Sequence, residues 1–218
     1  MSTNYNFECD TLINSFSGSD KIEQNYSQAY QDLFALTMLS GKTSGKYIEI
    51  GANDPIISNN TYLLENQFNW KGISVEIDNH MVDKFNNTRN EKCYCEDATT
   101  FDWLLSFKNK RWKTKQIDYL SVDCEPSMIT YEALLNIPHD QYRFSVITFE
   151  TEYYRGEIEA MDLQRSLLSD LGYKLVASDV CNMNNPFEDW WIDPKIVDES
   201  IWKPFESVNV EARSLFVK

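Results

Sequence analysis

The chain has 218 residues, with 34 acidic and 20 basic side chains and a formal net charge of −14 at pH 7. Hydrophobic residues make up 42% and aromatic residues 14%, so the chain can bury a sizeable core, which excludes a disordered protein. An acidic surface repels phosphate backbones, so we expect no nucleic-acid partner and a neutral or cationic substrate.

The first 25 residues are rich in Asn and Ser and weakly patterned, so we expect an N-terminal arm over 1–25. The remainder, 26–218, has the length of one domain. Its first element is predicted to be a helix with leucines on one side, which Ser27 caps and Gly41 ends.

Short apolar runs then alternate with helical stretches. The apolar runs predict strands at 47–50, 73–77, 92–95, 117–123, 144–150 and 173–177. The stretches between them predict helices at about 60–68, 79–88, 100–107, 127–136 and 156–171. Asp78 and Ser127 are the expected caps of two of these helices, and Gly172 closes the last. We expect the final strand or strands beyond Gly172, and the alternation predicts an α/β fold with a parallel sheet covered on both faces.

Acidic and small polar residues stand where the predicted strands end. The four segments concerned read Gly51-Ala52-Asn53-Asp54, Glu76-Ile77-Asp78, Asp123-Cys124-Glu125 and Glu150-Thr151-Glu152. Ligands of open α/β sheets bind beyond the carboxyl ends of the strands, so we expect these segments to form the functional site.

Three of these positions define the expected ligand. Gly51 allows a ligand to approach the backbone, and Glu76, 25 residues later, is placed to bind ribose hydroxyls. Asp97, in an Asp-Ala pair with Ala98, can accept a hydrogen bond from an adenine amino group. Asn53 and Ile56 replace the later glycines of a dinucleotide-binding turn, which argues for a ligand without a pyrophosphate.

Several stretches together resemble the FkbM family of methyltransferases. They are YSQ at 26–28 with QD at 31–32, YIEIGAND at 47–54, TYLLE at 61–65, WKGI at 70–73, DYLSVDCE at 118–125 and VITFE at 146–150. The match runs in order from about residue 26 to 178 and continues more weakly through 187–191. The combination is specific, although no single stretch is.

The resemblance implies a class I methyltransferase fold, which is a Rossmann-like, mostly parallel seven-stranded sheet, with S-adenosylmethionine as donor and a hydroxyl as acceptor. By similarity, Gly51 and Asn53 contact the methionine end, Glu76 the ribose, Asp97 the adenine, and Asp123 the region of the transferred methyl group. The predicted cofactor site also includes Gln28, which closes it from the N-terminal helix, together with Glu49, Ile77 and Ala98.

The chain departs from the family pattern at three positions. Pro55 and Pro126 stand where many relatives have glycine, and Thr151 stands where many have a histidine after the glutamate. Loss of that histidine removes a candidate base. Because a hydroxyl is a poor nucleophile, it needs either a base or a metal ion.

We therefore expect a carboxylate as the general base. The catalytic candidates are Asp123, Glu125, Glu150 and Glu152. No metal is expected to be required, although the same carboxylates can hold Mg²⁺. Trp190 and Trp191 are predicted to form an aromatic wall for a sugar, with core packing as the alternative.

The predicted function is methylation of a hydroxyl on a sugar or glycan, with S-adenosylhomocysteine as product. The alternatives are an O-methyltransferase of a macrolide-like metabolite, with or without Mg²⁺, and a non-catalytic cofactor-binding domain. The five cysteines show no zinc spacing and predict free thiols. With no apolar run near 18 residues and no signal-peptide core, we expect a cytoplasmic protein without a membrane span. The oligomeric state is not defined by the sequence.

Overall fold

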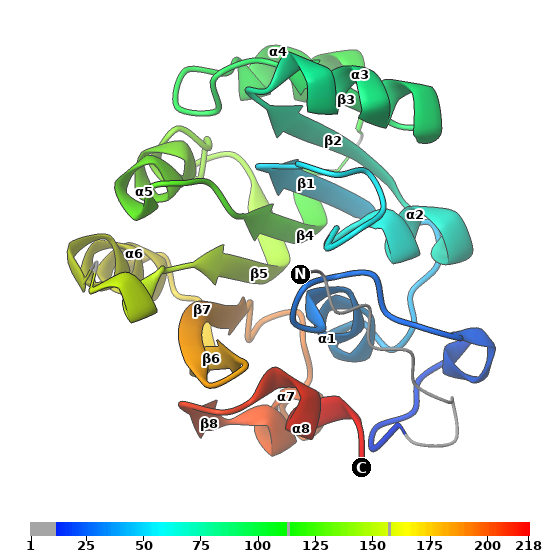
Figure 1. Cartoon of the computed structure of the whole chain (residues 1–218), viewed down its shortest axis with the longest axis vertical. Coiled ribbons are helices and arrows are strands. Elements are labelled where there is room, and N and C mark those ends of the chain that lie inside the picture. Colours follow the sequence, from blue (N-terminus) through cyan, green and yellow to red (C-terminus); the bar gives the residue numbers. More distant parts are fainter. Residues whose placement is uncertain (1–11, 113, 157) are drawn as a thin grey trace.

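A computed structural model describes residues 12–112, 114–156 and 158–218. One sheet of eight strands runs in the order β3-β2-β1-β4-β5-β7-β6-β8 (Figure 1). The strands are β1 (Lys46–Ile50), β2 (Lys71–Glu76), β3 (Lys92–Cys95), β4 (Gln116–Val122), β5 (Arg143–Glu150), β6 (Lys174–Asn182), β7 (Asn185–Ile192) and β8 (Ser207–Val208). β7 is antiparallel to both of its neighbours, and the other pairs are parallel.

Helices cover both faces of the sheet (Figure 1). They are α1 (Gln31–Met38), α2 (Tyr62–Phe68), α3 (Asn79–Thr88), α4 (Trp103–Asn109), α5 (Ser127–Leu135), α6 (Ile158–Asp170), α7 (Glu199–Trp202) and α8 (Ala212–Phe216). Short 3₁₀ turns lie at η2 (Ser19–Lys21), η3 (Tyr153–Arg155) and η4 (Lys203–Phe205). The α/β, Rossmann-like prediction is confirmed, with eight strands in place of seven because the two-residue strand β8 extends the edge.

Two apolar cores lie on opposite faces of the sheet. Tyr47 of β1 packs with α1 and α2, whereas Ile48 and Ile50 pack with α4, α5 and α6. Side chains alternate along a strand, so a strand that is covered on both sides must be apolar at nearly every position. This requirement explains why the continuous apolar runs correctly predicted the central strands.

The helix ends show which capping predictions were correct. The Asp78 carboxylate accepts from the His80 N–H at 2.8 Å and caps α3, as predicted. Gly172 follows α6 with a φ of 81°, which a residue without a Cβ adopts readily. Ser27 does not cap α1, because the helix begins at Gln31 and the Ser27 hydroxyl instead donates to Asp32 at 2.6 Å.

The second cap to be corrected is on α5. Ser127 is the first residue of that helix, and Pro126 occupies the N-cap position without a side-chain cap. Pro126 has the extended backbone of an N-cap residue, with a ψ of 169°, but its side chain carries no acceptor for the first N–H groups of the helix.

The described part of the predicted N-terminal arm packs on the domain. Leu12 forms a β-bridge with Val217, and Ile22 is fully buried in the α1-side core. Among the described residues, the four cysteines other than Cys9 are free thiols, and Cys9 lies outside them. No helix in the described ranges is long and apolar enough to cross a membrane.

Candidate functional site

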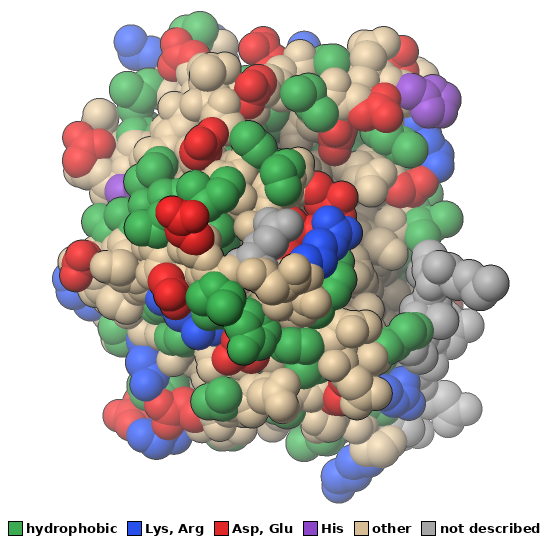
Figure 2. Space-filling model, turned by 60° about the vertical axis from the view of Figure 1, so that its left-hand side comes forward, with side chains coloured by type: hydrophobic (Ala, Val, Ile, Leu, Met, Phe, Trp, Pro, Cys, Tyr) green, Lys and Arg blue, Asp and Glu red, His purple; other side chains and the backbone are tan. Residues whose placement is uncertain are grey.

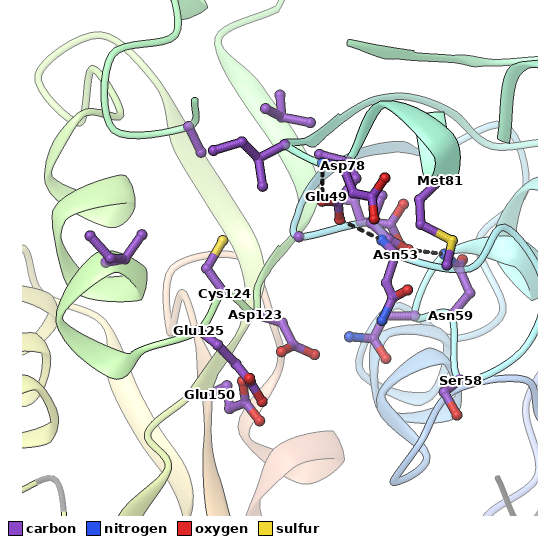
Figure 3. Close-up of a pocket in the computed structure, with 18 of the residues that line it drawn as sticks. Glu49, Asn53, Ser58, Asn59, Asp78, Met81, Asp123, Cys124, Glu125 and Glu150 are labelled. Atoms are coloured by element: carbon purple, nitrogen blue, oxygen red, sulfur yellow. Dashed lines mark hydrogen bonds between the residues drawn. The ribbon is translucent and has the colours of Figure 1, made fainter. Parts of the chain in front are cut away.

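A cavity of about 620 Å³ lies at the carboxyl ends of β1, β2, β4 and β5 (Figure 3). It is at the edge where the sequence predicted the site. All nine residues predicted to bind the cofactor line it: Gln28, Glu49, Gly51, Asn53, Glu76, Ile77, Asp97, Ala98 and Asp123. The fold thus gathers side chains from five separate segments around one space.

Gly51 forms the floor between β1 and β4. Its φ is 79°, and a Cβ at this position would lie 1.7 Å from the Asp123 carbonyl oxygen. The Gly51 N–H donates to Val75 at 2.9 Å, and the Asp123 N–H donates to Ile50 at 3.0 Å. Only glycine lets the two strand ends approach this closely, so Gly51 fixes where the Asp123 side chain begins.

The Glu76 carboxylate is oriented by backbone amides. Its two oxygens accept from the Asn53 N–H and the Asp78 N–H, each at 2.8 Å. A carboxylate has about four acceptor positions, so both oxygens retain capacity for further donors. Glu76 is therefore a fixed carboxylate that can accept hydrogen bonds from further donors, such as a pair of hydroxyl groups.

The far end of the cavity combines an acceptor with apolar side chains. Asp97 accepts from the Thr99 hydroxyl at 2.7 Å and the Thr99 N–H at 2.9 Å, and these bonds lower the pKa of Asp97. Ile77 is 73% exposed, and Ala98 lies beside Asp97. An apolar flank next to a fixed carboxylate suits a flat heterocycle that carries an amino group.

The opposite side of the cavity is what we call the acidic corner, formed by Asp123, Glu125 and Glu150 (Figure 3). Burial and the adjacent Asp123 carboxylate raise the pKa of Glu150 to about 12, so Glu150 keeps its proton and donates a hydrogen bond to Asp123. Burial also raises the pKa of Asp123, whereas the hydrogen bond from Glu150 lowers it. The other Glu150 oxygen has no hydrogen-bond partner among the described residues.

A further buried carboxylate, Glu188, lies behind the acidic corner. It is opposite Glu150 in the β5–β7 register and is 1% exposed. It accepts from the Trp190 indole N–H at 2.6 Å, and burial raises its pKa to about 8. The sequence analysis missed Glu188, because it lies near the start of a strand rather than at its end.

Of the four catalytic candidates, Glu152 does not line the cavity. It is fully buried, has a left-handed φ of 50° and forms an ion pair with Arg155 at 2.5 Å. Arg155 also pairs with Glu125 at 3.0 Å, where the Glu125 side chain is 64% exposed. The prediction that four carboxylates converge therefore holds for three, since the turn after β5 directs Glu152 toward Arg155.

The prediction of an aromatic wall was wrong. Trp190 and Trp191 are 0% and 1% exposed and belong to the two opposite cores. Trp190 stacks on Phe34, with ring centroids 4.5 Å apart. Both indoles therefore pack in the core, which was the alternative to the wall, and among the described residues the aromatic ring that lines the cavity is that of Tyr154.

The loop after β1 contributes amides that the sequence analysis did not select. Asn60 is buried and lines the cavity; its Nδ2 donates to the Ser121 hydroxyl at 2.9 Å, and its Oδ1 has no partner among the described residues. Asn59 donates to the carbonyls of Ala52 and Asp54 at 3.1 Å each, which shapes the loop. The only sequence signal was an Asn-Asn pair between a strand end and a helix.

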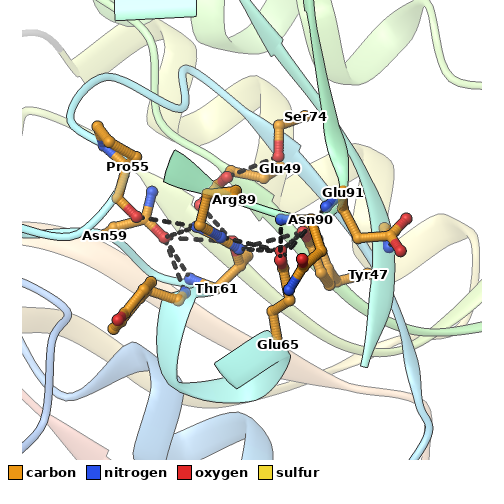
Figure 4. Close-up of polar contacts among 12 residues, drawn as sticks. Tyr47, Glu49, Pro55, Asn59, Thr61, Glu65, Ser74, Arg89, Asn90 and Glu91 are labelled. Carbon is orange, nitrogen blue, oxygen red and sulfur yellow. Dashed lines mark hydrogen bonds and ion pairs between the residues drawn. The ribbon is translucent and has the colours of Figure 1, made fainter. Parts of the chain in front are cut away.

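A buried arginine holds this loop from behind (Figure 4). The Arg89 guanidinium donates to the Pro55 carbonyl and to Asn59 Oδ1 at 3.0 Å each, and its ion pair with Glu65 measures 2.7 Å. Glu49 accepts from the Thr61 and Ser74 hydroxyls at 2.9 and 2.8 Å, and burial raises the pKa of Glu49 to about 7. This network fixes the wall of the cavity that carries the loop amides.

Comparison with known proteins shows the fold of the chain. No family model and no curated protein matches it. Among solved structures, the methyltransferase domain of METTL16 is similar with a TM-score of 0.56 and 10% identity, over 84% of this chain and 73% of that one. A proposed rRNA methylase from Clostridium thermocellum has a TM-score of 0.51 and 10% identity, over 75% and 92% of the two chains. A TehB-like SAM-dependent methyltransferase from Corynebacterium glutamicum has a TM-score of 0.48 and 13% identity, over 75% and 86%.

The chain therefore has the Rossmann-like fold of SAM-dependent methyltransferases. The similarity to the FkbM family remains a resemblance of short sequence stretches, because no family model matches.

Proposed function

We propose that this protein is an S-adenosylmethionine-dependent O-methyltransferase that methylates a hydroxyl of a sugar or glycan and releases S-adenosylhomocysteine. The observation that carries the proposal is the Asp123–Glu150 pair, which lines the cavity next to the Gly51 turn. A carboxylate at that place can act as the base that a hydroxyl acceptor requires.

The lining side chains fit this cofactor. Its sulfonium, ammonium, ribose hydroxyls and adenine amino group are cations or donors, and carboxylates are the matching acceptors. The amides of Gln28, Asn53 and Asn60 are available as donors or acceptors for the methionine end. A volume of about 620 Å³ falls within the range of about 300–1,000 Å³ that is usual for small-molecule sites.

The chain's own residues would position the acceptor and receive its proton. When bound, S-adenosylmethionine supplies an electrophilic methyl group. Asp123, which accepts a hydrogen bond from protonated Glu150, would accept a second one from the acceptor hydroxyl and take its proton during attack. Holding the hydroxyl at this position supplies the alignment on which methyl transfer depends.

The charge of the cavity favours an uncharged acceptor. The described lining residues include eight carboxylates and no Lys, Arg or His. On the face in Figure 2, the coloured Lys and Arg side chains are scattered rather than gathered into one broad patch. A phosphate backbone or a sugar phosphate would meet repulsion at this site.

The proposal is tested by incubating the protein with labelled S-adenosylmethionine and separate acceptor classes: neutral glycosides, nucleotide sugars, macrolide-type alcohols and RNA. We expect label in neutral glycosides, and its loss in an Asp123→Asn variant. Label confined to RNA or to non-sugar alcohols would overturn the sugar assignment. Absence of cofactor binding in calorimetry would overturn methyl transfer itself, whichever acceptor is offered.

A further inference from the structure

A short turn beside the cavity carries two exposed tyrosines. The turn is η3, which follows β5 directly, and its residues Tyr153 and Tyr154 are 40% and 44% exposed. Of the two rings, that of Tyr154 lines the cavity and that of Tyr153 does not. An aromatic ring at the border of a cavity offers a flat contact surface to a ligand.

The backbone holds this turn in a costly conformation. Glu152, which precedes η3, is fully buried and has a left-handed φ of 50°. The N–H groups of Thr151 and Glu152 donate to the Phe187 carbonyl at 2.6 and 3.2 Å, which ties the turn to β7. A buried carboxylate and a left-handed backbone at a non-glycine residue both cost stability. Such costs are typical of places where the fold must position a functional side chain.

Arg155 fixes the ring of Tyr154 from the same turn. Its guanidinium lies 5.3 Å from the centroid of that ring and forms ion pairs with Glu152 at 2.5 Å and with Glu125 at 3.0 Å. Glu125 follows β4, so the two ion pairs connect the ends of β4 and β5. The ring is therefore oriented before a ligand arrives, which reduces the entropy lost on binding.

The place of Tyr154 in the sheet indicates which ligand it meets. The strand order β2-β1-β4-β5 puts η3 three strands away from Glu76, roughly 14 Å at about 4.8 Å per strand. Glu76 is the residue proposed for the ribose, so Tyr154 lies far from the adenosine end and beside the acidic corner. Its neighbours in the lining are the apolar Ile129, which is 36% exposed, and the carboxylate of Glu125 (Figure 3).

We propose that Tyr154 is the platform on which a neutral pyranose ring of the acceptor stacks, with Glu125 and Arg155 binding its hydroxyls. This inference rests on the proposed function and adds the residue that selects a sugar ring over a linear alcohol. A pyranose has C–H groups on its faces and hydroxyls around its rim, so the ring of Tyr154 matches a face. The Glu125 carboxylate accepts from hydroxyls and the Arg155 guanidinium donates to them.

A nucleobase would also stack on a tyrosine. Its phosphates, however, would approach Glu125, whose side chain is 64% exposed, and the other carboxylates of the cavity. The charge of the surroundings therefore favours the neutral sugar.

The inference is tested by binding, which does not depend on turnover. The protein is saturated with S-adenosylhomocysteine and titrated, by ligand-observed NMR, with methyl glycosides of glucose, galactose and mannose, with 1-butanol and with a single-stranded RNA hexamer. We expect at least one glycoside to bind and the alcohol and RNA not to bind. Tyr154→Ala should weaken the glycoside about tenfold, and Tyr154→Phe, which keeps the ring, should restore most of the affinity.

The same turn supplies a matched control. Tyr153→Ala removes a ring of similar exposure that does not line the cavity, so glycoside affinity should stay at the wild-type value. Calorimetry with S-adenosylhomocysteine should give the same affinity for all variants, which shows that each is folded.

The possible failures are distinguishable. Glycoside affinity that is equal in wild type and Tyr154→Ala, or that falls equally in Tyr153→Ala, would overturn the platform and leave the proposed function intact. Binding of the RNA or the alcohol in place of every glycoside would overturn both the platform and the sugar acceptor. Failure of the wild-type protein to bind S-adenosylhomocysteine would overturn methyl transfer itself.

Discussion

Two groups of carboxylates near the cavity differ in what compensates their negative charge. Around Arg89, Glu65 forms an ion pair with a guanidinium whose side chain is 1% exposed, and the same positive charge lowers the pKa of the nearby Glu49 against the effect of burial (Figure 4). In the acidic corner, Asp123 and Glu150 share only a proton. The first group ties β1, α2 and the end of α3 together, and the second opens onto the cavity.

The difference distinguishes carboxylates that stabilise the fold from carboxylates that are available to a ligand. A cation inside the fold satisfies Glu65 and lowers its pKa, so that group is complete without a ligand. In the acidic corner, Asp123 and Glu150 form no ion pair among the described residues and line the cavity. Functional sites are where a fold tolerates such unsatisfied groups.

Removing the internal cation should have the largest effect. We expect Arg89→Met to lower the free energy of unfolding by about 3–5 kcal/mol, because Glu65 would remain buried without its partner. Urea denaturation followed by circular dichroism measures this. Lys203→Ala, which breaks exposed ion pairs with Glu199 and Glu206, is the control and should leave the midpoint unchanged. A loss no greater than that of the control would mean that Arg89 does not organise the loop.

Substitutions in the acidic corner should lower the turnover of methyl transfer. Asp123→Asn is expected to reduce turnover by about 10²-fold or more, since the amide cannot take the acceptor proton. Glu150→Gln leaves the Asp123 carboxylate in place and should reduce turnover less. Affinity for S-adenosylhomocysteine should stay nearly unchanged in both variants, because the side chains at the ribose and adenine ends of the cavity are unaltered. Unchanged turnover in Asp123→Asn would show that the base lies elsewhere.

Glu150 should also destabilise the fold at neutral and alkaline pH. The pKa of its carboxyl rises from 4.5 to about 12 on folding, so the folded chain keeps a proton that the unfolded chain releases above pH 4.5. Stability therefore falls as pH rises through that interval. Glutamine cannot ionise, so we expect Glu150→Gln to be more stable than wild type by up to about 5 kcal/mol at pH 8 and no more stable at pH 4. Denaturation curves at both pH values check this, and a gain that does not depend on pH would contradict it.

Sequence patterns predicted the bounds of helices and strands well where a local signal, such as a capping residue, marks them. The helix at 79–88 and the strand at 92–95 were predicted with the same bounds as α3 and β3. The cap at Asp78 marks the start of the helix, and the strand is the short run Cys93-Tyr94-Cys95 after Lys92. The strand-end rule then located the cavity, because parallel strands end at one edge of the sheet.

The same rule failed for Trp190 and Trp191 because β7 is antiparallel. Its carboxyl end lies beside the amino end of β5, at the edge away from the cavity, and its start places Glu188 opposite Glu150. The hydrophobic periodicity of the sequence does not show whether a strand of the last hairpin runs parallel or antiparallel to its neighbours. Asn60 was missed for a related reason, since its partner Ser121 is 61 residues away and no local pattern pairs them.

The smallest expected effect concerns metal removal, where we predict that activity survives EDTA. A hard divalent cation prefers about six oxygen ligands, with several of them charged. In the acidic corner, Glu125 pairs with Arg155, and Asp123 and Glu150 share a proton. No group of three or more potential ligands is arranged to hold a metal ion among the described residues. A carboxylate base needs no ion, so turnover with and without chelator should agree. Loss of turnover in EDTA, restored by Mg²⁺ or Mn²⁺, would show that the substrate completes a metal site. The contrast with the Arg89 network would then disappear, because a cation would compensate the carboxylates in both places.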